Sequence, residues 1–531
     1  MTGPEFSAAE STVLERYFTN LDRPVFALRN LPEVVKGALF SRYSRTEKSL
    51  RRVLLDEFIN DPESGFQGIA GAGPADDDMV AVQRAEEFYE RVLVGYGDDS
   101  VAELAGAHVA VERVSTLAAK ALEDSRIGIS PLEKSTRYVR FDRPGPDGHR
   151  LYHRGPELTH PAYEPAADAL FDAFSELLEP LTTSIRERFP LEPGESDRGW
   201  KSATRAKALD LLRGLLPAGT LTNLGLFGNG RAFEYLITKL ASNELPECRG
   251  LADDLHRELA QVIPAFVKRA LDEKYGRPAS ERMEKVRRAL TSMSRREESP
   301  AAVSDSPSVR LVGHDPDAEQ KVVQAALFPY SDRPLGDQSA DADAVLEALL
   351  SGRANRRQRA PRALEHAQYK FEIVANFAAY RDLHRHRMLT QDRQLLGTAL
   401  GYDVPPALAE LGMESRFRSA IESAAAAHRQ LETELGAAVA QYVVPLAFRV
   451  RWYFRVNLRE IYHLCELRTT PQGHPDYRWV AQEMFRQVSQ VHPRLARYAT
   501  FVDMGPGDEL ERRQAERRLD EKLRTLDRRV L

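Results

Sequence analysis

Arg385, His386 and Arg387 form a dense basic triplet directly after an apolar run from Phe377 to Leu383. The apolar run predicts a helix. Residues two positions apart do not share a helix face, so Arg385 and Arg387 either address different partners or the helix ends before them. Guanidinium groups offer permanent, forked donors that suit phosphate and carbonyl oxygens. The triplet is therefore a candidate binding element, and a solvated or ion-paired basic cluster is the alternative.

A second candidate lies in residues 129–141, where Glu133 precedes Ser135, Thr136 and Arg137. Pro131 and the hydroxyl residues predict a loop that leads into an extended segment. A serine hydroxyl, backbone N–H groups and an arginine can together cradle a phosphate. The alternative is an ordinary capped turn with a surface arginine.

A third candidate is Arg468, which ends a helical pattern that begins at Leu458. The apolar stripe of this helix is typical of core, and Cys465 within it is expected to be a small core hydrophobe. An arginine at a helix C-terminus is also favourable to the helix dipole, which gives a structural explanation for Arg468. His384 and His386 lack a third ligand at metal spacing, so no metal site is predicted.

Two further charged segments have simpler interpretations. The run from Arg353 to Arg359 is expected to be a solvated loop, with nucleic-acid binding as the alternative. The tail 507–531 mixes both signs of charge at helical spacing, which predicts a solvated helix.

Composition limits the classes of protein that fit. The chain has 531 residues, a formal charge of −5 and 42% hydrophobic residues, which excludes wholesale disorder and a globally basic binder. Its two cysteines, Cys248 and Cys465, cannot build a disulfide framework and fit a reducing, cytoplasmic compartment. Neither a signal peptide nor an apolar run of about 18 residues is seen, so we expect no membrane contact.

Three features recur in the same order in both halves of the chain: a glutamate before an alternating apolar segment, a proline, and an Asn-x-Arg sequence. Glu103 corresponds to Glu365, Pro217 to Pro445 and Asn229 to Asn457, and the last two pairs have the same separation. The alternation after each glutamate predicts a strand with one buried face. Each half is therefore predicted to be a helix-rich α/β (α+β) domain, and the chain a tandem duplication.

The predicted organisation follows from this repeat. Residues 1–20 form an N-terminal extension, 21–291 the first copy, 292–316 a linker rich in Ser, Pro and charge, 317–506 the second copy and 507–531 the charged tail.

The ordered motifs resemble the flavin-dependent thymidylate synthases. In that family a Glu-His pair opens a strand, and an Arg-His-Arg triplet is followed by Ser-x-Arg-Tyr, Leu-Pro, Asn-x-Arg and a helix ending in Leu-Arg. The second half matches at Glu365-His366, the Arg385 triplet, Asn457-Leu458-Arg459 and Leu467-Arg468. The first half matches at Ser135-Thr136-Arg137-Tyr138, Leu216-Pro217 and Asn229-Gly230-Arg231. Asp382 stands where the family favours glutamine, which predicts an altered specificity.

The departures from the family pattern are complementary. The first half lacks the basic triplet, in whose place stands Asp124-Ser125-Arg126, and the second half has lost the serine loop. In the family, each active site takes these two sets from neighbouring subunits of a homotetramer. The resemblance therefore implies a pseudo-dimeric chain with one type of composite site, and a homodimer of chains that imitates the tetramer.

The resemblance also implies the chemistry. It assigns FAD as cofactor, NADPH and methylenetetrahydrofolate as co-substrates, and transfer of a one-carbon unit to C5 of dUMP or a related pyrimidine nucleotide. The implied nucleotide-binding residues are Glu133, Ser135, Thr136, Arg137, Arg213, Arg385 and Arg468, and Arg468 would also act in catalysis. The implied FAD-binding residues are Arg385, His386, Arg387, Asn457, Arg459 and His463. A flavin- or nucleotide-binding pseudoenzyme and, less favoured, an arginine-rich nucleic-acid binder stay open.

Overall fold

The computed structural model describes residues 6–60, 102–136, 139–294 and 306–530. The chain forms two compact units. Unit 1 comprises Met1–Glu112, Ala118–Glu133 and Asn223–Arg296, and unit 2 comprises Arg113–Leu117, Lys134–Thr222 and Glu297–Leu531. Unit 2 therefore contains residues 134–222 of the predicted first copy together with the whole predicted second copy.

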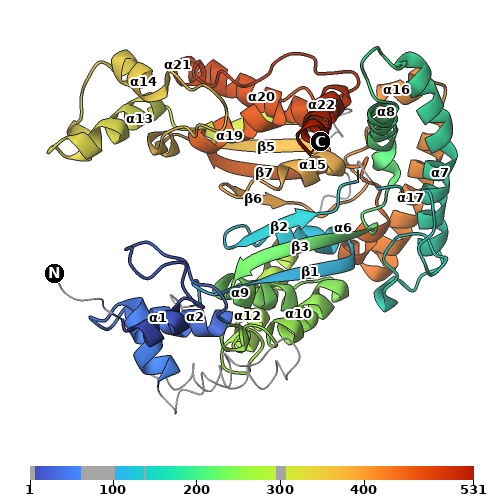
Figure 1. Cartoon of the computed structure of the whole chain (residues 1–531). Coiled ribbons are helices and arrows are strands. Elements are labelled where there is room, and N and C mark those ends of the chain that lie inside the picture. Colours follow the sequence, from blue (N-terminus) through green and yellow to red (C-terminus); the bar gives the residue numbers. More distant parts are fainter. Residues whose placement is uncertain (1–5, 61–101, 137–138, 295–305, 531) are drawn as a thin grey trace. The chain divides into compact units, whose positions relative to one another are not determined.

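The first sheet has the strand order β1-β3-β2, with β1 (Gly106–Ser115), β3 (Leu221–Asn229) and β2 (Ile129–Glu133). Strand β2 runs antiparallel to β3, with Ile129 opposite Gly228. Helices α9, α10 and α12 lie on one side of this sheet (Figure 1). The helices described in unit 1 are α1 (Ala8–Leu14), α2 (Glu33–Tyr43), α3 (Leu50–Leu54), η1 (Leu55–Ile59), α6 (Thr116–Glu123), α9 (Gly230–Ala241), α10 (Pro246–Leu259), α11 (Pro264–Val267) and α12 (Gly276–Met293).

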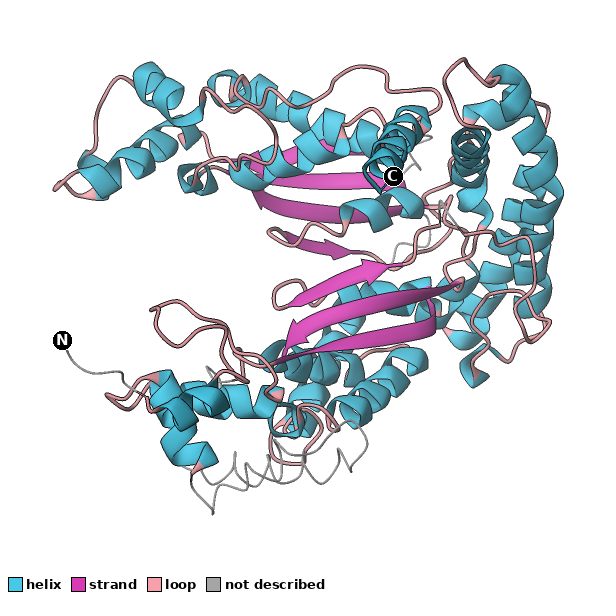
Figure 2. Ribbon diagram, viewed as in Figure 1, coloured by secondary structure: helices cyan, strands magenta, loops and turns pink. Residues whose placement is uncertain are grey.

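The second sheet has the order β4-β5-β7-β6, with β4 (Ser308–His314), β5 (Gln368–Asn376), β7 (Arg449–Asn457) and β6 (Thr390–Arg393). All neighbours are antiparallel, and β5 pairs with β7 from Gln368 opposite Asn457 to Asn376 opposite Arg449. The predicted alternation is confirmed in β5, where Tyr369, Phe371 and Ile373 are buried. Helices α19 (Leu458–Arg468) and α20 (Pro475–Val491) cover one face of this sheet (Figure 2).

The two sheets repeat one pattern. The orders β1-β3-β2 and β5-β7-β6 are equivalent, and in each case the middle strand runs directly into a helix capped by an asparagine. Asn229 Oδ1 accepts from the Ala232 N–H at 2.8 Å, and Asn457 Oδ1 accepts from the Glu460 N–H at 2.9 Å. The asparagine of each Asn-x-Arg motif is thus a helix N-cap. This shared order agrees with the predicted helix-rich α+β class and with the duplication.

Among the described residues, strand β4 has no counterpart in the first sheet, and it corrects the predicted linker. The second half of residues 292–316 pairs with β5 instead of running free. Alternating Val309 and Leu311 fill its less exposed face, but Ser, Pro and charged neighbours obscured that short alternation in the sequence.

The two copies cross inside unit 2. Pro217 forms an isolated antiparallel bridge with Pro445. The Ala218 N–H donates to Val444 O at 2.8 Å, and the Leu446 N–H donates to Leu216 O at 2.9 Å. A Cβ at Gly219 would lie 2.8 Å from Tyr442 O, so this crossing needs a glycine. The equivalent prolines of the repeat therefore meet each other within one chain.

Long helices flank this crossing. Helix α7 (Tyr163–Arg188) packs against α17 (Glu414–Leu435) and against α8 (Asp197–Leu212), and α7 buries Leu170, Phe171 and Phe174. The other helices of unit 2 are η4 (Pro156–Leu158), η5 (Arg213–Leu215), α13 (Ala318–Leu327), η6 (Phe328–Tyr330), η7 (Leu335–Asp337), α14 (Ala342–Leu350), η8 (Arg362–His366), α15 (Phe377–Leu383), α16 (Pro406–Glu410), α18 (Ala437–Ala440), η9 (Gln441–Val443), α21 (Pro493–Ala496) and α22 (Arg513–Val530).

Helix α22 corrects the expected solvated tail. The tail is helical, but one face of α22 lies against α8, with Glu516 and Asp520 buried there. The Ser202 hydroxyl donates to Glu516 at 3.0 Å, and Arg198 pairs with Asp520 at 3.2 Å. Some of the charged side chains that indicated a solvated tail therefore form hydrogen bonds and ion pairs with α8.

Across the described part of the chain, no helix combines the length and the apolar character that a bilayer crossing requires.

Candidate functional site

Two neighbouring cavities of unit 2 share Arg385 and Arg468 as lining residues. The small pocket has a volume of about 240 Å³ and is lined by Ser135, Thr136, Arg213, Ala378, Arg381, Asp382, Arg385, Arg468, Tyr477 and Arg512. The large pocket has a volume of about 390 Å³, and its lining includes Arg353, Arg356, Arg359, Glu365, Arg385, His386, Arg387, Asn457, Arg459, Glu460, His463, Glu466 and Arg468.

Local structure explains how these side chains reach the pockets. Helix α15 begins at the Asn376 cap and ends at Leu383, so the basic triplet follows the helix instead of lying on it. His386 is then buried while Arg385 and Arg387 are exposed. Of the two alternatives left by the sequence, the structure shows the second, in which the helix ends before the triplet. Arg468 is the last residue of α19, and Arg213 follows the last turn of α8.

The small pocket carries a surplus of positive charge. Five arginines line it against one carboxylate, Asp382. Asp382 Oδ2 accepts from Arg213 Nη1 at 3.0 Å, and the Arg213 side chain is only 6% exposed. A cavity of this size with several convergent guanidinium groups suits a phosphate group and its near surroundings.

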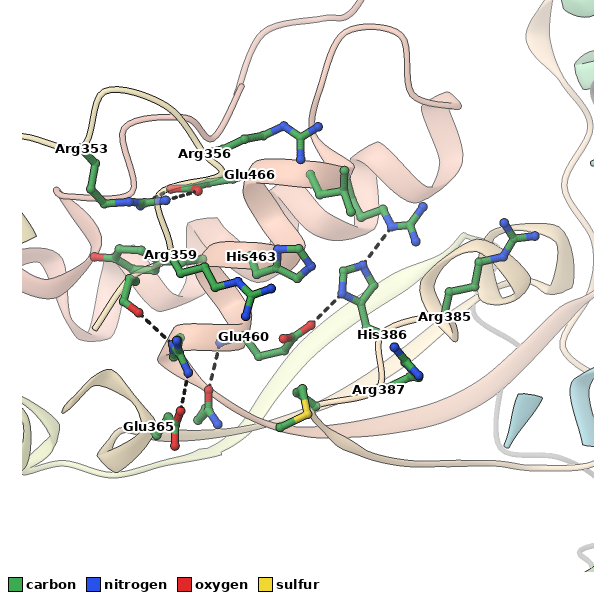
Figure 3. A pocket seen from close by; sticks show the side chains of 17 residues that line it. Arg353, Arg356, Arg359, Glu365, Arg385, His386, Arg387, Glu460, His463 and Glu466 are labelled. Atoms are coloured by element: carbon green, nitrogen blue, oxygen red, sulfur yellow. Dashed lines mark hydrogen bonds and ion pairs between the residues drawn. The ribbon is translucent and has the colours of Figure 1, made fainter. Parts of the chain in front are cut away.

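A hydrogen-bond chain runs from Arg468, which lines both pockets, through buried His386 to Glu460 in the large pocket (Figure 3). Arg468 Nε donates to His386 Nε2 at 3.0 Å, so this nitrogen is the acceptor and the ring is neutral with its proton on Nδ1. His386 Nδ1 then donates to Glu460 Oε1 at 2.7 Å. Burial and the neighbouring Arg468 hold the pKa of His386 well below its ordinary value. Burial raises the pKa of Glu460 to about 7.

The hydrogen bonds of His386 also argue against a metal ion at this place. His386, Glu460 and His463 offer three ligand atoms within 4.8 Å of one another. However, a guanidinium already occupies His386 Nε2, and Arg387 and Arg459 line the same cavity. A cation placed there would be repelled by these guanidinium groups, and the cluster itself supplies one carboxylate, Glu460, to offset them. We therefore assign the cluster to the hydrogen-bond chain.

The loop from Arg353 to Ala360 is not simply solvated, which corrects the expectation from sequence. Arg353 donates to both oxygens of Glu466 at 2.7 Å, and the side chains are 9% and 2% exposed. Arg459 Nε donates to Ala360 O at 2.8 Å, which fixes the other end of the loop to α19. Arg356 and Arg359 are consequently held at the large pocket, and their side chains have no ion-pair partner among the described residues (Figure 3).

The structure brings most of the predicted site residues together. Ser135, Thr136 and Arg213 from the first copy line the small pocket beside Arg385 and Arg468 from the second. Arg385, His386, Arg387, Asn457, Arg459 and His463 all line the large pocket. Glu133 instead belongs to unit 1, where its buried carboxylate pairs with Lys120 at 3.0 Å. Arg137 lies outside the described residues.

Two predicted flavin ligands also have structural partners. Asn457 Oδ1 caps α19, and Arg459 Nη1 pairs with Glu365 at 2.7 Å. The equivalent pair in unit 1 is Arg231 with Glu103 at 2.8 Å. Both copies have this ion pair. The Asn-x-Arg motif therefore has a structural role in each copy, in addition to any role in binding.

Sequence reasoning missed Arg381, Glu460, Tyr477 and Arg512 as lining residues. Glu460 could have been found from its position three residues after the capping Asn457. No local signal points to Arg512, because its place depends on the docking of α22 on α8.

Comparisons with known proteins agree with the repeated architecture. A profile described as "thymidylate synthase complementing protein" matches residues 58–265 and 310–494, which are two separate segments and fit a tandem duplication. A protein of Chlamydia muridarum called "UPF0159 protein" is 44% identical over 97% of this chain and 98% of its own length. A relative from Thermoplasma acidophilum with a similar name is 34% identical over 88% of this chain and 95% of its own length.

Shorter proteins match one part of the chain. The "flavin-dependent thymidylate synthase" of Geobacter sulfurreducens is 28% identical over 38% of this chain and 87% of its own length. Among solved structures, the UMP/dUMP methylase PolB of Streptomyces cacaoi aligns at 21% identity and a TM-score of 0.32, covering 37% of this chain and 95% of its own. By the two profile segments and the full-length relatives, the chain belongs to the thymidylate synthase complementing protein family.

Proposed function

We propose that this protein is a flavin-dependent, thymidylate synthase-like methyltransferase that adds a one-carbon unit to C5 of dUMP or a related pyrimidine nucleotide. The observation that carries the proposal is the small pocket, where Ser135 and Arg213 of the first copy meet Arg385 and Arg468 of the second. These are the two complementary sets that the family resemblance divides between neighbouring subunits.

The charges of the two pockets support this pair of ligands. The small pocket has room for a phosphate and donors on several sides. In the large pocket seven arginines face three carboxylates, and two of those carboxylates are already paired with Arg353 and Arg459. The remaining surplus of positive charge suits the diphosphate of a dinucleotide such as FAD. We propose Arg385, His386, Arg387, Asn457, Arg459 and His463 as its ligands.

Orientation and electrostatics are the work of the protein side chains in this proposal. Ser135, Thr136 and Arg213 hold the nucleotide phosphate and sugar, together with Arg137. Arg385 and Arg468 line both pockets, so they are suited to keep nucleotide and cofactor in contact. A bound flavin would supply the reducing equivalent that brings the transferred carbon to the methyl level.

Arg468 is the proposed catalytic residue. Its Nε is engaged by neutral His386, so the plane of the guanidinium is fixed. Negative charge that develops on the pyrimidine ring during attack at C5 would be stabilised by this oriented cation. His386 accepts a hydrogen bond from Arg468 and donates one to Glu460, so its ring is neutral. It therefore orients the arginine without adding a second positive charge.

The experiment is release of tritium from C5-labelled dUMP by the purified protein with FAD, methylenetetrahydrofolate and NADPH. The proposal expects release that requires all of these components, because substitution at C5 displaces its hydrogen. Bound flavin without release favours a pseudoenzyme. A colourless protein that carries nucleic acid favours the nucleic-acid binder.

Two wider assignments accompany the function. We propose that two chains associate into a homodimer that imitates the family's tetramer, which light scattering after gel filtration tests. We also propose a cytoplasmic location, since Cys248 and Cys465 are both buried free thiols.

A further inference from the structure

Of the carboxylates described in the large pocket, Glu365 and Glu466 are paired with arginines, whereas Glu460 is bonded to neutral His386. We infer that Glu460 is a proton donor for the reaction in the large pocket, and that the exposed His463 returns protons to it from solvent. This inference rests on the proposed function and deepens it, because the family motifs give Glu460 no role.

The two oxygens of the Glu460 carboxyl group face different surroundings. Oε1 accepts from His386 Nδ1 at 2.7 Å, and the other ring nitrogen of His386 accepts from Arg468. No described residue forms a hydrogen bond with Oε2. The side chain is only 9% exposed, yet it lines the large pocket (Figure 3). A protonated Oε2 can therefore donate to a molecule in the pocket while Oε1 keeps its bond to His386.

The surroundings of Glu460 keep a proton on it near neutral pH. Burial has the largest effect and raises its pKa to about 7, although the charges of His463, Arg459 and Arg468 oppose this rise. The charged and titratable side chains that line the pocket around it are His386 and Arg387 after α15, Arg359 in the loop before η8, Glu365 on η8, and Arg459, His463, Glu466 and Arg468 on α19. An acid with a pKa near the working pH is both populated in its protonated form and able to release the proton.

The equivalent helix of the first copy shows that helix capping does not require an acid at this position. Asn457 Oδ1 accepts from the Glu460 N–H, and Asn229 Oδ1 accepts from the Ala232 N–H, so residues 460 and 232 are equivalent. The cap uses only the backbone N–H, which alanine also supplies. Burial of a carboxyl group costs free energy, so Glu460 needs another reason to be there. The acid belongs to the copy that has the basic triplet.

The proposed reaction consumes a proton, which gives this acid a task. The new methyl group takes up the hydride of NADPH by way of the flavin. Both nitrogens that hold the bridging carbon of methylenetetrahydrofolate gain a proton, while C5 of the pyrimidine loses one, so the balance is one proton taken up.

In the inferred step, the proton leaves Glu460 Oε2 and forms an N–H bond on one of these nitrogens. The bond from that nitrogen to the bridging carbon breaks, and its electron pair stays on the nitrogen. Glu460 is left as a carboxylate. His463 then returns a proton to it, because its ring is exposed and the two residues offer atoms within 4.8 Å of each other.

The test compares Glu460→Gln with Glu483→Gln. Glutamine keeps an acceptor for His386 Nδ1 and a donor toward the pocket, but it has no proton to transfer. Glu483 is a matched control, because it lies on α20 and lines neither pocket. In a single turnover, Glu460→Gln should form the methylated nucleotide about 100-fold more slowly or worse. Its FAD content and dUMP affinity should equal those of the wild type, and Glu483→Gln should match the wild type throughout.

The pH dependence of the rate gives a second readout. The wild-type rate should fall as pH rises through about 7, because the protonated form of Glu460 is lost. The residual rate of Glu460→Gln should not follow this fall, whereas Glu460→Asp should keep it together with part of the rate.

Infrared difference spectra of the purified protein test the acid without any co-substrate, since carboxylic acids and carboxylates absorb at different frequencies. The wild type should show a carboxylic acid band that disappears as pH rises through about 7 and that is missing from Glu460→Gln.

Three outcomes overturn the inference. The first is a Glu460→Gln protein with the rate and pH profile of the wild type. The second is a loss of FAD or dUMP binding that accounts for the loss of rate, which would indicate a structural role. The third is a wild type without the titrating infrared band. If the band titrates but the wild type forms no methylated nucleotide, the proposed function fails, and the inferred step fails with it. Thermal melting of each variant identifies a failure to fold.

Discussion

Arg213 Nη1 lies 3.0 Å from Asp382 Oδ2, so the first copy's phosphate-binding candidate is paired with a carboxylate of the second copy. Asp382→Asn keeps a hydrogen-bond acceptor for Arg213 but removes the negative charge. We expect it to tighten binding of dUMP by roughly tenfold and to leave deoxyuridine unchanged, because only the phosphate feels the lost repulsion. Calorimetry with both ligands checks this. Weaker dUMP binding would mean that Asp382 mainly orients Arg213.

Arg468→Ala should abolish measurable nucleotide binding, a loss of roughly 100-fold or more, because it removes a cation shared by both pockets. Arg126→Ala is the control, since Arg126 stands in the first copy where the basic triplet is missing and lines neither pocket. Equilibrium dialysis with labelled dUMP measures both. Equal damage from Arg126→Ala would contradict the asymmetric division of the site.

The double substitution Arg356→Ala with Arg359→Ala should weaken binding of FAD by about 10- to 100-fold and that of riboflavin hardly at all. The reason is that both arginines line the large pocket and would meet the diphosphate, which riboflavin lacks. Quenching of flavin fluorescence gives the affinities. Arg357→Ala, in the same loop but outside the lining, serves as the control; an equal loss there would point to general electrostatic attraction.

Glu460 gives the protein a defined pH dependence. Burial raises its pKa to about 7 in the folded state, so its contribution to stability is present below its unfolded pKa and is lost as pH rises through about 7. Glu460→Gln keeps an acceptor for His386 Nδ1 but cannot ionise. Relative to wild type, its free energy of unfolding should rise by about 1–3 kcal/mol between about pH 5 and about pH 8. Urea titrations at several pH values measure the difference, and parallel pH profiles would contradict it.

The sequence predicted the parts of the fold that local pattern controls. Alternation after Glu365 located the buried face of β5, and the apolar run before Arg385 located a helix that ends where the triplet begins. The repeated order of glutamate, proline and Asn-x-Arg predicted a tandem duplication, and the equivalent strand orders of the two sheets agree with it. These features can be predicted from a single sequence because each depends on residues that are close together along the chain.

Features that depend on distant partners were not accessible in the same way. The run from Arg353 to Arg359 is indistinguishable from a solvated loop until Glu466 is known to lie beside Arg353. Likewise α22 has the composition of a solvated helix, and its contacts with Arg198 and Ser202 on α8 show which of its charges are used. In both cases an ion pair across more than one hundred residues decides the outcome, and such pairs leave no periodicity in the sequence.

The antiparallel bridge between Pro217 and Pro445 has a consequence for how the protein behaves on dilution. If the two strands belonged to separate subunits, the subunits would dissociate at low concentration, and one wall of the pocket would be lost. Here the two strands are tethered by their own backbone, so their effective concentration is fixed by the covalent connection. Formation of the small pocket therefore does not depend on association with a second molecule, because one chain supplies both sets of residues at any protein concentration.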